Sequence, residues 1–364
     1  MSLQDVAYAV PKDTSLDTSK FLNLFQEGET PPGVEGTPSL RVCVLGGAGF
    51  IGSRLTRELL EEGHAVTVVD AMWFGSNLPT DRLEQVLQVD YASLPPEFFK
   101  DFDAVVLLAG HSSVKMCVSD MGHSFRNNVA KMVNLLDTLE TLAARTKRRL
   151  RFIYASSSSV YGNASDASVV DETYQIHSPN NFYDLSKWVI DLYSKLSKVE
   201  AYGLRFGTVC GASPNLRTDV MLNAMTTDAL SRREVRLYVE HIRRPVLGIK
   251  DLCRAVHTIL SSRQDRRGLY NLCSFNGTVR EYGDAVGAAL KVPVNTYTAG
   301  QVETMTNVKL QSKHYDFAIS PKQFEQAFNF TFKDTVPSVI AELVEALGNK
   351  SVLKTTRNLR RAAL

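Results

Sequence analysis

The chain has 364 residues, of which 44% are hydrophobic and 22% are charged, as in an ordinary globular protein with one large domain or two lobes. Its net charge of +2 excludes a strong overall attraction to nucleic acid, anionic membranes or acidic partners. The sequence contains no apolar run that approaches the roughly 18 residues of a membrane-spanning helix.

The first segment, residues 1–38, is polar and ends in the linker-like sequence Pro31-Pro32-Gly33 and its neighbours. Thr18 and Ser19 are candidate caps for a short helix. The segment carries acidic residues early and lacks the apolar core of a signal peptide, so we expect neither secretion nor organelle import. We interpret it as an extension without chemistry of its own.

The five cysteines are scattered along the chain, odd in number and never arranged as a CxxC pair. This pattern favours a reducing compartment and offers neither a disulfide framework nor a zinc site. We therefore predict a cytoplasmic protein without a bound metal.

From residue 40 onward, short apolar runs alternate with helical patterns over 51–62, 128–143 and 184–198, which predicts βα units and a parallel sheet. After about residue 212 this alternation weakens. The predicted fold is α/β: a Rossmann-type doubly wound parallel sheet with a smaller, mixed α/β C-terminal lobe. The candidate strands are Leu40–Leu45, Ala65–Val69, Gln85–Val89, Ala104–Leu108, Arg151–Tyr154 and Glu200–Leu204. The predicted units are an extension (1–38), a core (39–211), a substrate lobe (212–348) with some segments returning to the core, and a basic tail (349–364).

The stretch GGAGFIG (46–52) follows the first predicted strand and opens the first predicted helix. Gly46, Gly49 and Gly52 allow a tight turn and a close approach of backbone N–H groups to a pyrophosphate, where the helix N-terminus adds partial positive charge. The next strand ends in Asp70, which is placed to accept hydrogen bonds from an adenosine ribose. Because this acid repels a 2′-phosphate and no arginine follows it, the predicted cofactor is NAD rather than NADP.

Two later strand ends fit the same cofactor. Asp90 places a carboxylate where it would accept from the adenine amino group, although a plain cap or turn is the structural alternative. The sequence Leu108-Ala109-Gly110 ends a strand in small residues, past which a cofactor can run close to the backbone. The other predicted cofactor contacts are Phe50, Ile51, Tyr91 and Asn128.

The sequence FYDLSK (182–187) places Tyr183 and Lys187 about one helical turn apart, shortly after four consecutive serines. A phenol has a pKa near 10 and is a poor base at neutral pH, and a neighbouring ammonium is expected to lower that pKa. With a serine hydroxyl on the same substrate oxygen and a nicotinamide beside it, such a site supports hydride transfer at a secondary alcohol or carbonyl. The alternative without chemistry is that Tyr183 and Lys187 merely share a helix face and that the serines form a flexible polar loop.

Taken together, the motifs resemble the extended short-chain dehydrogenase/reductases, in particular the NAD-dependent sugar-nucleotide epimerases and dehydratases. The resemblance implies that Tyr183 is the acid/base group and that Lys187 is its partner and a contact of the nicotinamide ribose. It makes Ser157, four residues before Tyr161, the catalytic hydroxyl, and Ser159 a sugar contact. The matching segments, spread over about 40–345, are GGAGFIG (46–52), Asp70, Asp90, LLAG (107–110), the helix of Asn128, SSSSVYG (156–162), YDLSK (183–187), LRFGTVCG (204–211) and RRPVLGIKDLCRAV (243–256).

The residues after Ser157 indicate the reaction. Relatives that remove water from the sugar have Asp-Glu at this place, whereas this chain has Ser158-Ser159, and the acid of the decarboxylases and the cysteine of the C3/C5 epimerases are absent as well. The resemblance therefore favours C4 epimerisation of a nucleotide-activated sugar. A dehydratase or net dehydrogenase/reductase on a similar substrate is the alternative, and a non-catalytic NAD-responsive scaffold or nucleic-acid-binding relative is the alternative of a different class.

The resemblance also implies substrate contacts. Arg244 aligns with the arginine that holds a substrate phosphate, a task that suits a guanidinium fork. Arg217 and Asn223 lie in the segment that lines the nucleotide pocket, and a solvated loop is the alternative for Arg217. Thr208 and Gly248 depart from the Asn and His common in the family, which puts the nucleotide end of the site in doubt.

Members of this family are commonly homodimers, so we expect a homodimer and no nucleic-acid or membrane partner. The helices over 128–143 and 184–198 would form the interface by resemblance. The apolar positions of the first helix recur at helical spacing and fit either an interface or the face toward the sheet. They are Val129, Met132, Val133, Leu136 and Leu139.

Overall fold

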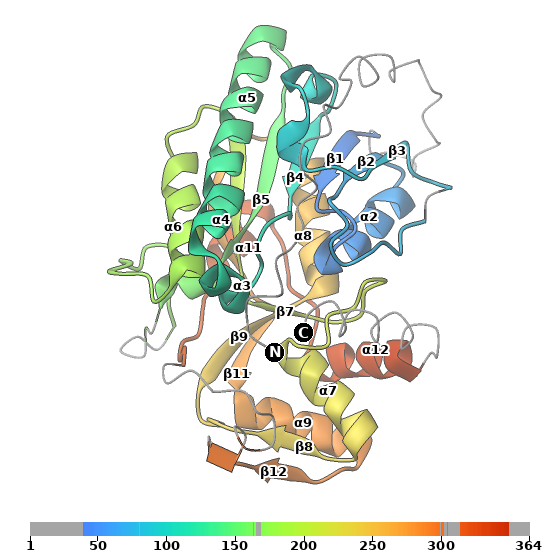
Figure 1. The fold of residues 1–364 in the computed structure, drawn as a ribbon, viewed down its shortest axis with the longest axis vertical. Coiled ribbons are helices and arrows are strands. Elements are labelled where there is room, and N and C mark those ends of the chain that lie inside the picture. The colour runs from blue at the N-terminus through green and yellow to red at the C-terminus, as the bar shows by residue number, and fades with distance from the viewer. Residues whose placement is uncertain are drawn as a thin grey trace, which may run out of the picture.

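A computed structural model describes residues 39–348, apart from 80, 163, 165–168, 299, 302–303 and 305–313. The predicted N-terminal helix and the basic tail lie outside these residues. The centre of the described part is a seven-stranded parallel sheet with the order β10-β6-β5-β4-β1-β2-β3 (Figure 1). Helices cover both faces of this sheet, which confirms the predicted Rossmann-type doubly wound fold.

Six strands of the main sheet begin at or within one residue of the predicted positions, because five of them are largely apolar runs buried on both faces, while β3 is half-buried. The seventh strand was not predicted, since it follows an excursion of about sixty residues through the C-terminal lobe. The register pairs Leu45 with Leu107, and Leu107 with Tyr154, so the carboxyl ends of neighbouring strands meet at one edge. The strands are β1 (Arg41–Leu45), β2 (Ala65–Val69), β3 (Gln85–Leu87), β4 (Ala104–Leu107), β5 (Arg151–Ser157), β6 (Glu200–Phe206) and β10 (Gly268–Leu272).

Two layers of helices enclose the sheet, each with its own apolar core. The first layer contains α2 (Phe50–Glu61), α8 (Ile249–Ser261) and α11 (Lys322–Phe328). The second contains α5 (Lys131–Thr146) and α6 (Phe182–Ser194), with the short helices α3 (Val114–Ser119) and α4 (Met121–Phe125) beside α6 (Figure 1).

The apolar positions of the predicted 128–143 helix face the sheet. Val129, Met132, Leu136 and Leu139 are buried in the core of the second layer, and Val133 packs against them. The helix α5 itself starts later than predicted, because residues 126–130 form a π-helical turn. The structure thus assigns these side chains to the core.

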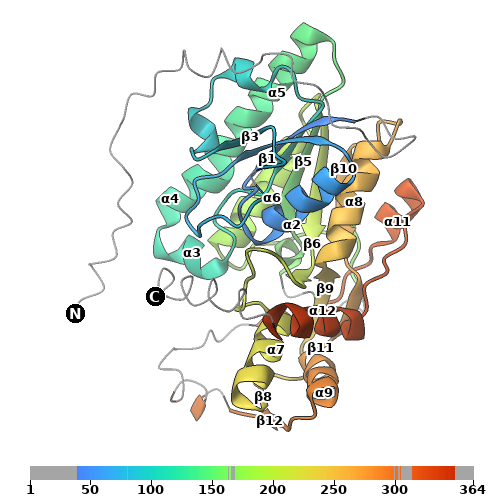
Figure 2. The same cartoon turned by 90° about the vertical axis from the view of Figure 1, so that its right-hand side faces the viewer.

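The C-terminal lobe lies at the carboxyl edge of the main sheet, below it in Figures 1 and 2. It has a separate apolar core and two small sheets, with the orders β11-β9-β7 and β12-β8, so it is a mixed α/β unit as predicted. Its elements are β7 (Thr208–Cys210), α7 (Met221–Arg232), β8 (Val235–Leu237), β9 (Arg243–Gly248), β11 (Phe275–Thr278), α9 (Val279–Leu290), β12 (Val294–Thr296) and α12 (Val336–Gly348).

The departure at Gly248 has a local cause. A Cβ atom at this position would lie 2.0 Å from the Asp334 carboxylate. That carboxylate accepts a hydrogen bond from Asp251 N at 3.1 Å, next to the first turn of α8. The aspartate therefore fills the space that a larger residue at 248 would need.

All five cysteines are buried free thiols: Cys43, Cys117, Cys210, Cys253 and Cys273. Within residues 39–348 as described, no helix is both long and apolar enough to cross a membrane.

Candidate active site

The glycine turn joins β1 to α2. Gly46 has a φ of +87°, in the left-handed region, and a Cβ there would lie 2.5 Å from Ala109 N. A Cβ on Gly52 would lie 2.0 Å from the Gly46 carbonyl oxygen, whereas at Gly49 the same oxygen would be 3.4 Å away. Close packing therefore requires Gly46 and Gly52, while Gly49 leaves the start of the helix open.

The start of α2 suits an anion. Its N-cap, Gly49, supplies no side-chain hydrogen bond, so the first N–H groups of the helix remain available. Phe50 and Ile51 form the first turn. A pyrophosphate fits this arrangement, as the sequence predicts.

Asp70 lies beside the same turn. Its Oδ2 accepts from Ala48 N at 2.9 Å and its Oδ1 accepts from Met72 N at 2.7 Å. Burial raises the pKa of this carboxyl, and the backbone hydrogen bonds counter the rise. Each oxygen can accept a further hydrogen bond, which is what a ribose diol requires.

Asp90 has the partners of a cap. Its Oδ1 accepts from Ala92 N at 3.0 Å, and its Oδ2 forms an ion pair with Lys131. Tyr91 is buried, which raises the pKa of its hydroxyl. A contact between Asp90 and adenine stays a prediction, and it would compete with Lys131.

The end of β4 is held by Asn128. Leu108 N and Ala109 N donate to the same β1 carbonyl, at 2.8 and 2.9 Å, and Gly110 follows with a φ of +147°. Asn128 is buried, accepts from His111 N at 2.8 Å and donates to His111 O at 3.0 Å. In this structure Asn128 therefore shapes the strand end that the cofactor is predicted to pass.

The three predicted catalytic residues lie together where β5 ends and α6 begins. Ser157 is the last residue of β5. Burial raises the pKa of the Tyr183 phenol, and the Ser157 hydroxyl counters part of this rise. Ser157 Oγ also lies 2.8 Å from Ser159 Oγ. Lys187 Nζ lies 5.8 Å from the centre of the Tyr183 ring and donates to Ala155 O at 2.6 Å.

The predicted action of Lys187 on Tyr183 stays a prediction, because other groups dominate the pKa of this phenol. Burial raises the pKa of Tyr183 to about 12, and the groups that counter the rise are Ser157 and Arg217. Burial also lowers the pKa of Lys187 to about 8. The ammonium is directed at the backbone carbonyl of Ala155 rather than at the phenol oxygen, and Arg217 supplies the positive charge that favours the phenolate.

Arg217 is half-buried beside the catalytic tyrosine. It forms a two-pronged ion pair with Asp219, at 2.9 and 2.8 Å, and donates to Ser112 Oγ at 3.5 Å. The positive charge of Arg217 counters part of the rise that burial causes in the pKa of Tyr183. A substrate contact of Arg217 stays a prediction beside the alternative of a solvated loop arginine, because its ion pair with Asp219 is exposed.

Asn223 holds the loop that carries Arg217. Its side chain is fully buried, accepts from Gly211 N at 3.0 Å, and donates to Gly211 O at 3.3 Å and Arg217 O at 2.8 Å. The same loop is tied to the glycine turn by Asn215, which donates to Ala48 O at 2.9 Å. The backbone occupies the polar atoms of Asn223, so we assign it to positioning the loop rather than to the predicted substrate contact.

Arg244 differs from Arg217 in that its guanidinium has no ion pair or hydrogen bond to the described residues, whereas its carbonyl oxygen accepts from Tyr282 OH at 2.8 Å. It lies in β9, and its guanidinium carbon stands 5.5 Å from the centre of the Tyr315 ring. Burial lowers the pKa of Arg244. A half-buried guanidinium without a carboxylate partner is suited to an anionic ligand, as predicted.

Sequence reasoning missed a group next to Tyr183. The Asp184 carboxylate is fully buried and accepts from Tyr315 OH at 2.6 Å and from Asn181 Nδ2 at 3.0 Å. Its place directly after Tyr183 is the one sequence signal that could have indicated it. Tyr315 follows 131 residues later and has no such signal.

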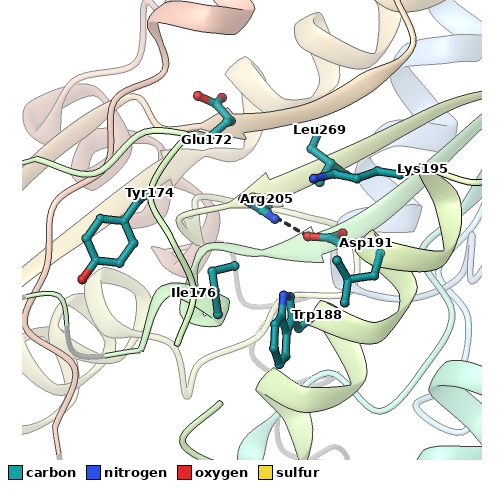
Figure 3. A pocket seen from close by; sticks show the side chains of 9 residues that line it. Glu172, Tyr174, Ile176, Trp188, Asp191, Lys195, Arg205 and Leu269 are labelled. Carbon is teal, nitrogen blue, oxygen red and sulfur yellow. Dashed lines mark hydrogen bonds and ion pairs between the residues drawn. The ribbon is translucent and has the colours of Figure 1, made fainter. Parts of the chain in front are cut away.

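A separate cavity of about 130 Å³ lies beside α6 and contains none of the predicted site residues (Figure 3). Its central charges satisfy each other, because Arg205 Nε donates to Asp191 Oδ2 at 2.8 Å and Arg205 also donates to Tyr161 OH at 2.9 Å. The lining is Glu172, Tyr174, Ile176, Trp188, Asp191, Leu192, Lys195, Arg205 and Leu269. The cavity therefore does not belong to the catalytic centre.

Comparisons with known proteins agree with this geometry. A UDP-glucose 4-epimerase of Lactobacillus helveticus is 29% identical over 182 residues, which is 48% of this chain and 53% of the relative. A dTDP-glucose 4,6-dehydratase of Streptomyces niveus is 28% identical over 240 residues, 61% of this chain and 69% of the relative. This chain thus spans about half to two thirds of the length of these relatives.

The fold is shared with MoeE5, solved in complex with UDP-glucuronic acid and NAD, at a TM-score of 0.71 and 23% identity over 85% of this chain and 99% of that one. A model of the NAD-dependent epimerase/dehydratase family matches residues 42–273, which is more than half of the chain. The open helix start and the Asp70 carboxylate fit the cofactor of that family, NAD. The chain belongs to the NAD-dependent epimerase/dehydratase family.

Proposed function

We propose that this protein inverts C4 of a nucleotide-activated sugar by transient hydride transfer. The observation that carries the proposal is the meeting of Ser157, Tyr183 and Lys187 at the end of β5, with Ser158-Ser159 where an eliminating enzyme has Asp-Glu. An epimerase needs one group that takes a proton and returns it, and Tyr183 can do both.

The residues have separate tasks in this reaction. The Tyr183 oxygen takes the proton of the C4 hydroxyl, and the Ser157 hydroxyl holds the same substrate oxygen. Bound NAD would supply the hydride acceptor and donor for C4. Tyr183 then gives its proton back to the carbonyl oxygen after the sugar has turned its other face, so protons and electrons balance. Lys187 would hold the nicotinamide ribose.

The cofactor would be held by the remaining groups of the glycine side. The start of α2, at Gly49, Phe50 and Ile51, would bind the pyrophosphate, and Asp70 the adenosine ribose. The open edge after β4, at Leu108, Ala109 and Gly110, would let the cofactor pass the backbone. Arg244 would bind a phosphate of the nucleotide sugar.

A second candidate concerns the sugar. A guanidinium fork suits a sugar carboxylate, and at Arg217 such a carboxylate would have to replace the Asp219 carboxylate. One structural neighbour was solved with UDP-glucuronic acid, so an acidic sugar is the variant of the proposal that Arg217 favours. Dehydration is the runner-up reaction because one relative is a dehydratase, but Ser158-Ser159 supply no carboxyl acid for elimination.

Denaturing the purified protein and identifying the released small molecules by mass spectrometry tests the cofactor and the substrate class. We expect the release of NAD, either together with a nucleotide sugar or from a protein that binds an added nucleotide sugar. Turnover of a nucleotide-sugar panel, followed by NMR of the products, then tests the C4 chemistry. Stoichiometric formation of NADH would indicate net dehydrogenation and contradict epimerisation. A Tyr183→Phe variant that keeps full biological activity would favour a non-catalytic scaffold.

We also propose that the protein is a cytoplasmic homodimer that pairs through the side of α6. Exposed apolar side chains cluster on the neighbouring helices α3, α4 and α6, which contact one another. Light scattering during gel filtration should give twice the chain mass, and Leu196→Glu should give monomers. The exposed side chains are Val118, Met121, Phe125, Phe182, Leu192 and Leu196.

A further inference from the structure

Arg244 is supported by an aromatic ring rather than by a carboxylate. Its guanidinium carbon stands 5.5 Å from the centre of the Tyr315 ring, within the roughly 6 Å over which a ring face attracts a cation. A ring face takes up none of the N–H donors of a guanidinium, whereas the Asp219 carboxylate occupies the fork of Arg217. Tyr315 therefore supports Arg244 and leaves its donors available to an anion.

The hydroxyl group of Tyr315 is fixed at the start of the catalytic helix α6. It donates to Oδ2 of the buried Asp184 at 2.6 Å, the length of a hydrogen bond to a charged oxygen. It also accepts from Nδ2 of Asn181, the N-cap of α6, and this nitrogen donates to Asp184 Oδ2 at 3.0 Å as well. Both residues lie within two positions of Tyr183, so the Tyr315 phenol is tied to the turn that carries the catalytic tyrosine.

The segment that carries Tyr315 is fixed to the C-terminal lobe on its other side. The next residue, Asp316, accepts from the backbone N and from Nε of Arg243 in β9, at 2.9 and 3.0 Å. The buried Phe317 donates its backbone N–H to Arg243 O at 3.3 Å. The segment thus follows β9, and Tyr315 reaches from this strand to α6.

We propose that Tyr315 is a positioning residue that fixes Arg244 relative to Tyr183. A nucleotide sugar has its phosphates at one end and its sugar at the other, and the proposed reaction needs these ends at Arg244 and Tyr183 at the same time. Arg244 belongs to the C-terminal lobe and Tyr183 to the core, so their spacing depends on how the two units are joined.

Tyr315 joins the two units through one side chain, with its ring on Arg244 and its hydroxyl on Asp184. These two contacts form the Tyr315 bridge. The inference rests on the proposed function, because it takes Arg244 as the phosphate site and Tyr183 as the acid/base group.

The ring and the hydroxyl of Tyr315 have separable effects. Tyr315→Phe keeps the ring on Arg244 but releases it from α6. Because a misplacement of about 1 Å at the reacting atoms can cost about 10²-fold in rate, we expect Tyr315→Phe to lower kcat by about tenfold with little change in phosphate affinity. Tyr315→Leu removes the ring as well, so it should lower both kcat and phosphate affinity.

Calorimetric titration of the NAD-bound full chain with nucleoside diphosphates tests the ring. The probe is whichever of UDP, dTDP, ADP and GDP the wild-type protein binds most tightly. Arg244→Gln should weaken its binding by about 10²-fold and Tyr315→Leu by about tenfold, whereas Tyr315→Phe should stay within about twofold of wild type. Wild-type affinity in a Tyr315→Leu protein that melts as a folded chain would overturn the proposal, and so would a wild-type protein that binds none of the four probes.

Hydrogen exchange followed by mass spectrometry tests the hydroxyl without any turnover. A nucleoside diphosphate lacks the sugar that would touch Tyr183, so an effect on α6 reports coupling through the protein. Binding of the diphosphate should slow amide exchange in a peptide over 181–187 by about fivefold in the wild type, and should leave it unchanged in Tyr315→Phe. No slowing in the wild type, or the same slowing in Tyr315→Phe, would contradict the Tyr315 bridge.

Tyr282→Phe is the matched control. Tyr282 also donates its hydroxyl to β9, to the Arg244 carbonyl oxygen at 2.8 Å, but it belongs to α9 within the C-terminal lobe. Tyr282→Phe should lower the melting temperature, as Tyr315→Phe does, but keep kcat and the exchange response of α6. Equal losses of kcat in the two variants would assign the effect to a general loosening of the lobe and overturn the proposal.

The two kinds of measurement separate this proposal from the proposed function. If the wild type turns over no nucleotide sugar but its exchange response depends on Tyr315, the Tyr315 bridge stands and epimerisation falls. If the wild type epimerises a nucleotide sugar and Tyr315→Phe does so with unchanged kcat, the proposed function stands and the Tyr315 bridge falls.

Discussion

The two helices that begin at the catalytic edge, α2 and α6, start in opposite ways. The N-terminus of α2 has a glycine as N-cap and no side-chain cap. The N-terminus of α6 is capped by Asn181, whose side chain accepts from Asp184 N at 3.0 Å and donates to the buried Asp184 carboxylate. One helix leaves its first N–H groups to a ligand, and the other uses them to fix its own first turn.

The difference follows from what each helix presents. The pyrophosphate proposed for α2 is bound by the backbone, so side chains are absent where it approaches. In contrast, α6 presents side chains, Tyr183 and Lys187, whose positions depend on the rigidity of the first turns. The same element of secondary structure can thus serve as a ligand site or as a support, depending on its cap.

Among substitutions on the α6 side, we expect the largest loss of turnover from Tyr183→Phe. We expect kcat to fall by about 10²–10⁴-fold, because the proton-transfer group is lost, while NAD still binds at α2. Steady-state kinetics and fluorescence titration with NADH measure the two effects. Tyr193→Phe, on the same helix, removes only an exposed hydrogen bond to Asp137 and should keep full turnover. Equal losses in both variants would mean that α6 responds as a whole.

The α2 side is tested by Gly52→Ala. The added Cβ would stand 2.0 Å from the Gly46 carbonyl oxygen, so the turn must open, at a cost of about 3 kcal/mol in the free energy of unfolding and with loss of NAD binding. Urea unfolding and NAD titration measure both. Gly348→Ala, at the end of α12, meets no atom within 4 Å and is the control. A Gly52→Ala protein with normal NAD affinity would refute the close-packed turn.

The far end of α2 gives a pH prediction through His64, which follows this helix and is buried. Burial and His257 lower the pKa of His64 from 6.5 to about 4. Between these values the unfolded chain binds the proton that the folded one does not, so stability is full above about pH 6.5 and is lost as the pH falls through 4. The loss amounts to about 3 kcal/mol.

Urea unfolding at several pH values measures this loss. His64→Gln should flatten the dependence, whereas substitution of the exposed His177 should leave it unchanged. An unchanged slope in His64→Gln would assign the acid sensitivity to other groups.

We expect the smallest effects from substitutions at the two N-cap residues, Asn181 of α6 and Gly49 of α2. Asn181→Ala removes the cap of α6 and should cost about 1 kcal/mol of stability with little change in NAD affinity. Gly49→Ala removes no cap hydrogen bond, so stability should hold, but the methyl group stands at the open start of α2 and should weaken NAD binding. Thermal melts and NAD titrations of both variants check that one loses stability and the other loses NAD affinity. Equal losses of stability and NAD affinity in both variants would contradict the proposed difference between the two helix starts.

Local residues predicted the α2 side almost completely. Strand, glycine turn, helix and Asp70 lie within thirty residues, and each has a physical requirement that a sequence pattern expresses. The α6 side was predicted only where its residues are near in sequence, as with Tyr183 and Lys187.

Long-range contacts were not predictable in this way. Arg217 and Tyr315 reach the catalytic centre from distant loops, and no periodicity indicates which side chain will meet Tyr183. Burial is the largest influence on the pKa of Tyr183, and burial is a property of the whole fold. The strand β10 was not predicted for the same reason, since its partner β6 lies some sixty residues earlier.

The labelling rates of the five buried cysteines can report how fast different parts of the folded chain open. A thiol reagent can reach them only when the surrounding core opens, so the rate of labelling measures opening rather than surface reactivity. Cys117 lies in α3, which contacts α6, Cys43 lies in the interior strand β1 and Cys210 lies in the C-terminal lobe. Mass spectrometry of the labelled peptides would therefore time the opening of the catalytic centre, the sheet and the lobe separately, in one unmodified protein.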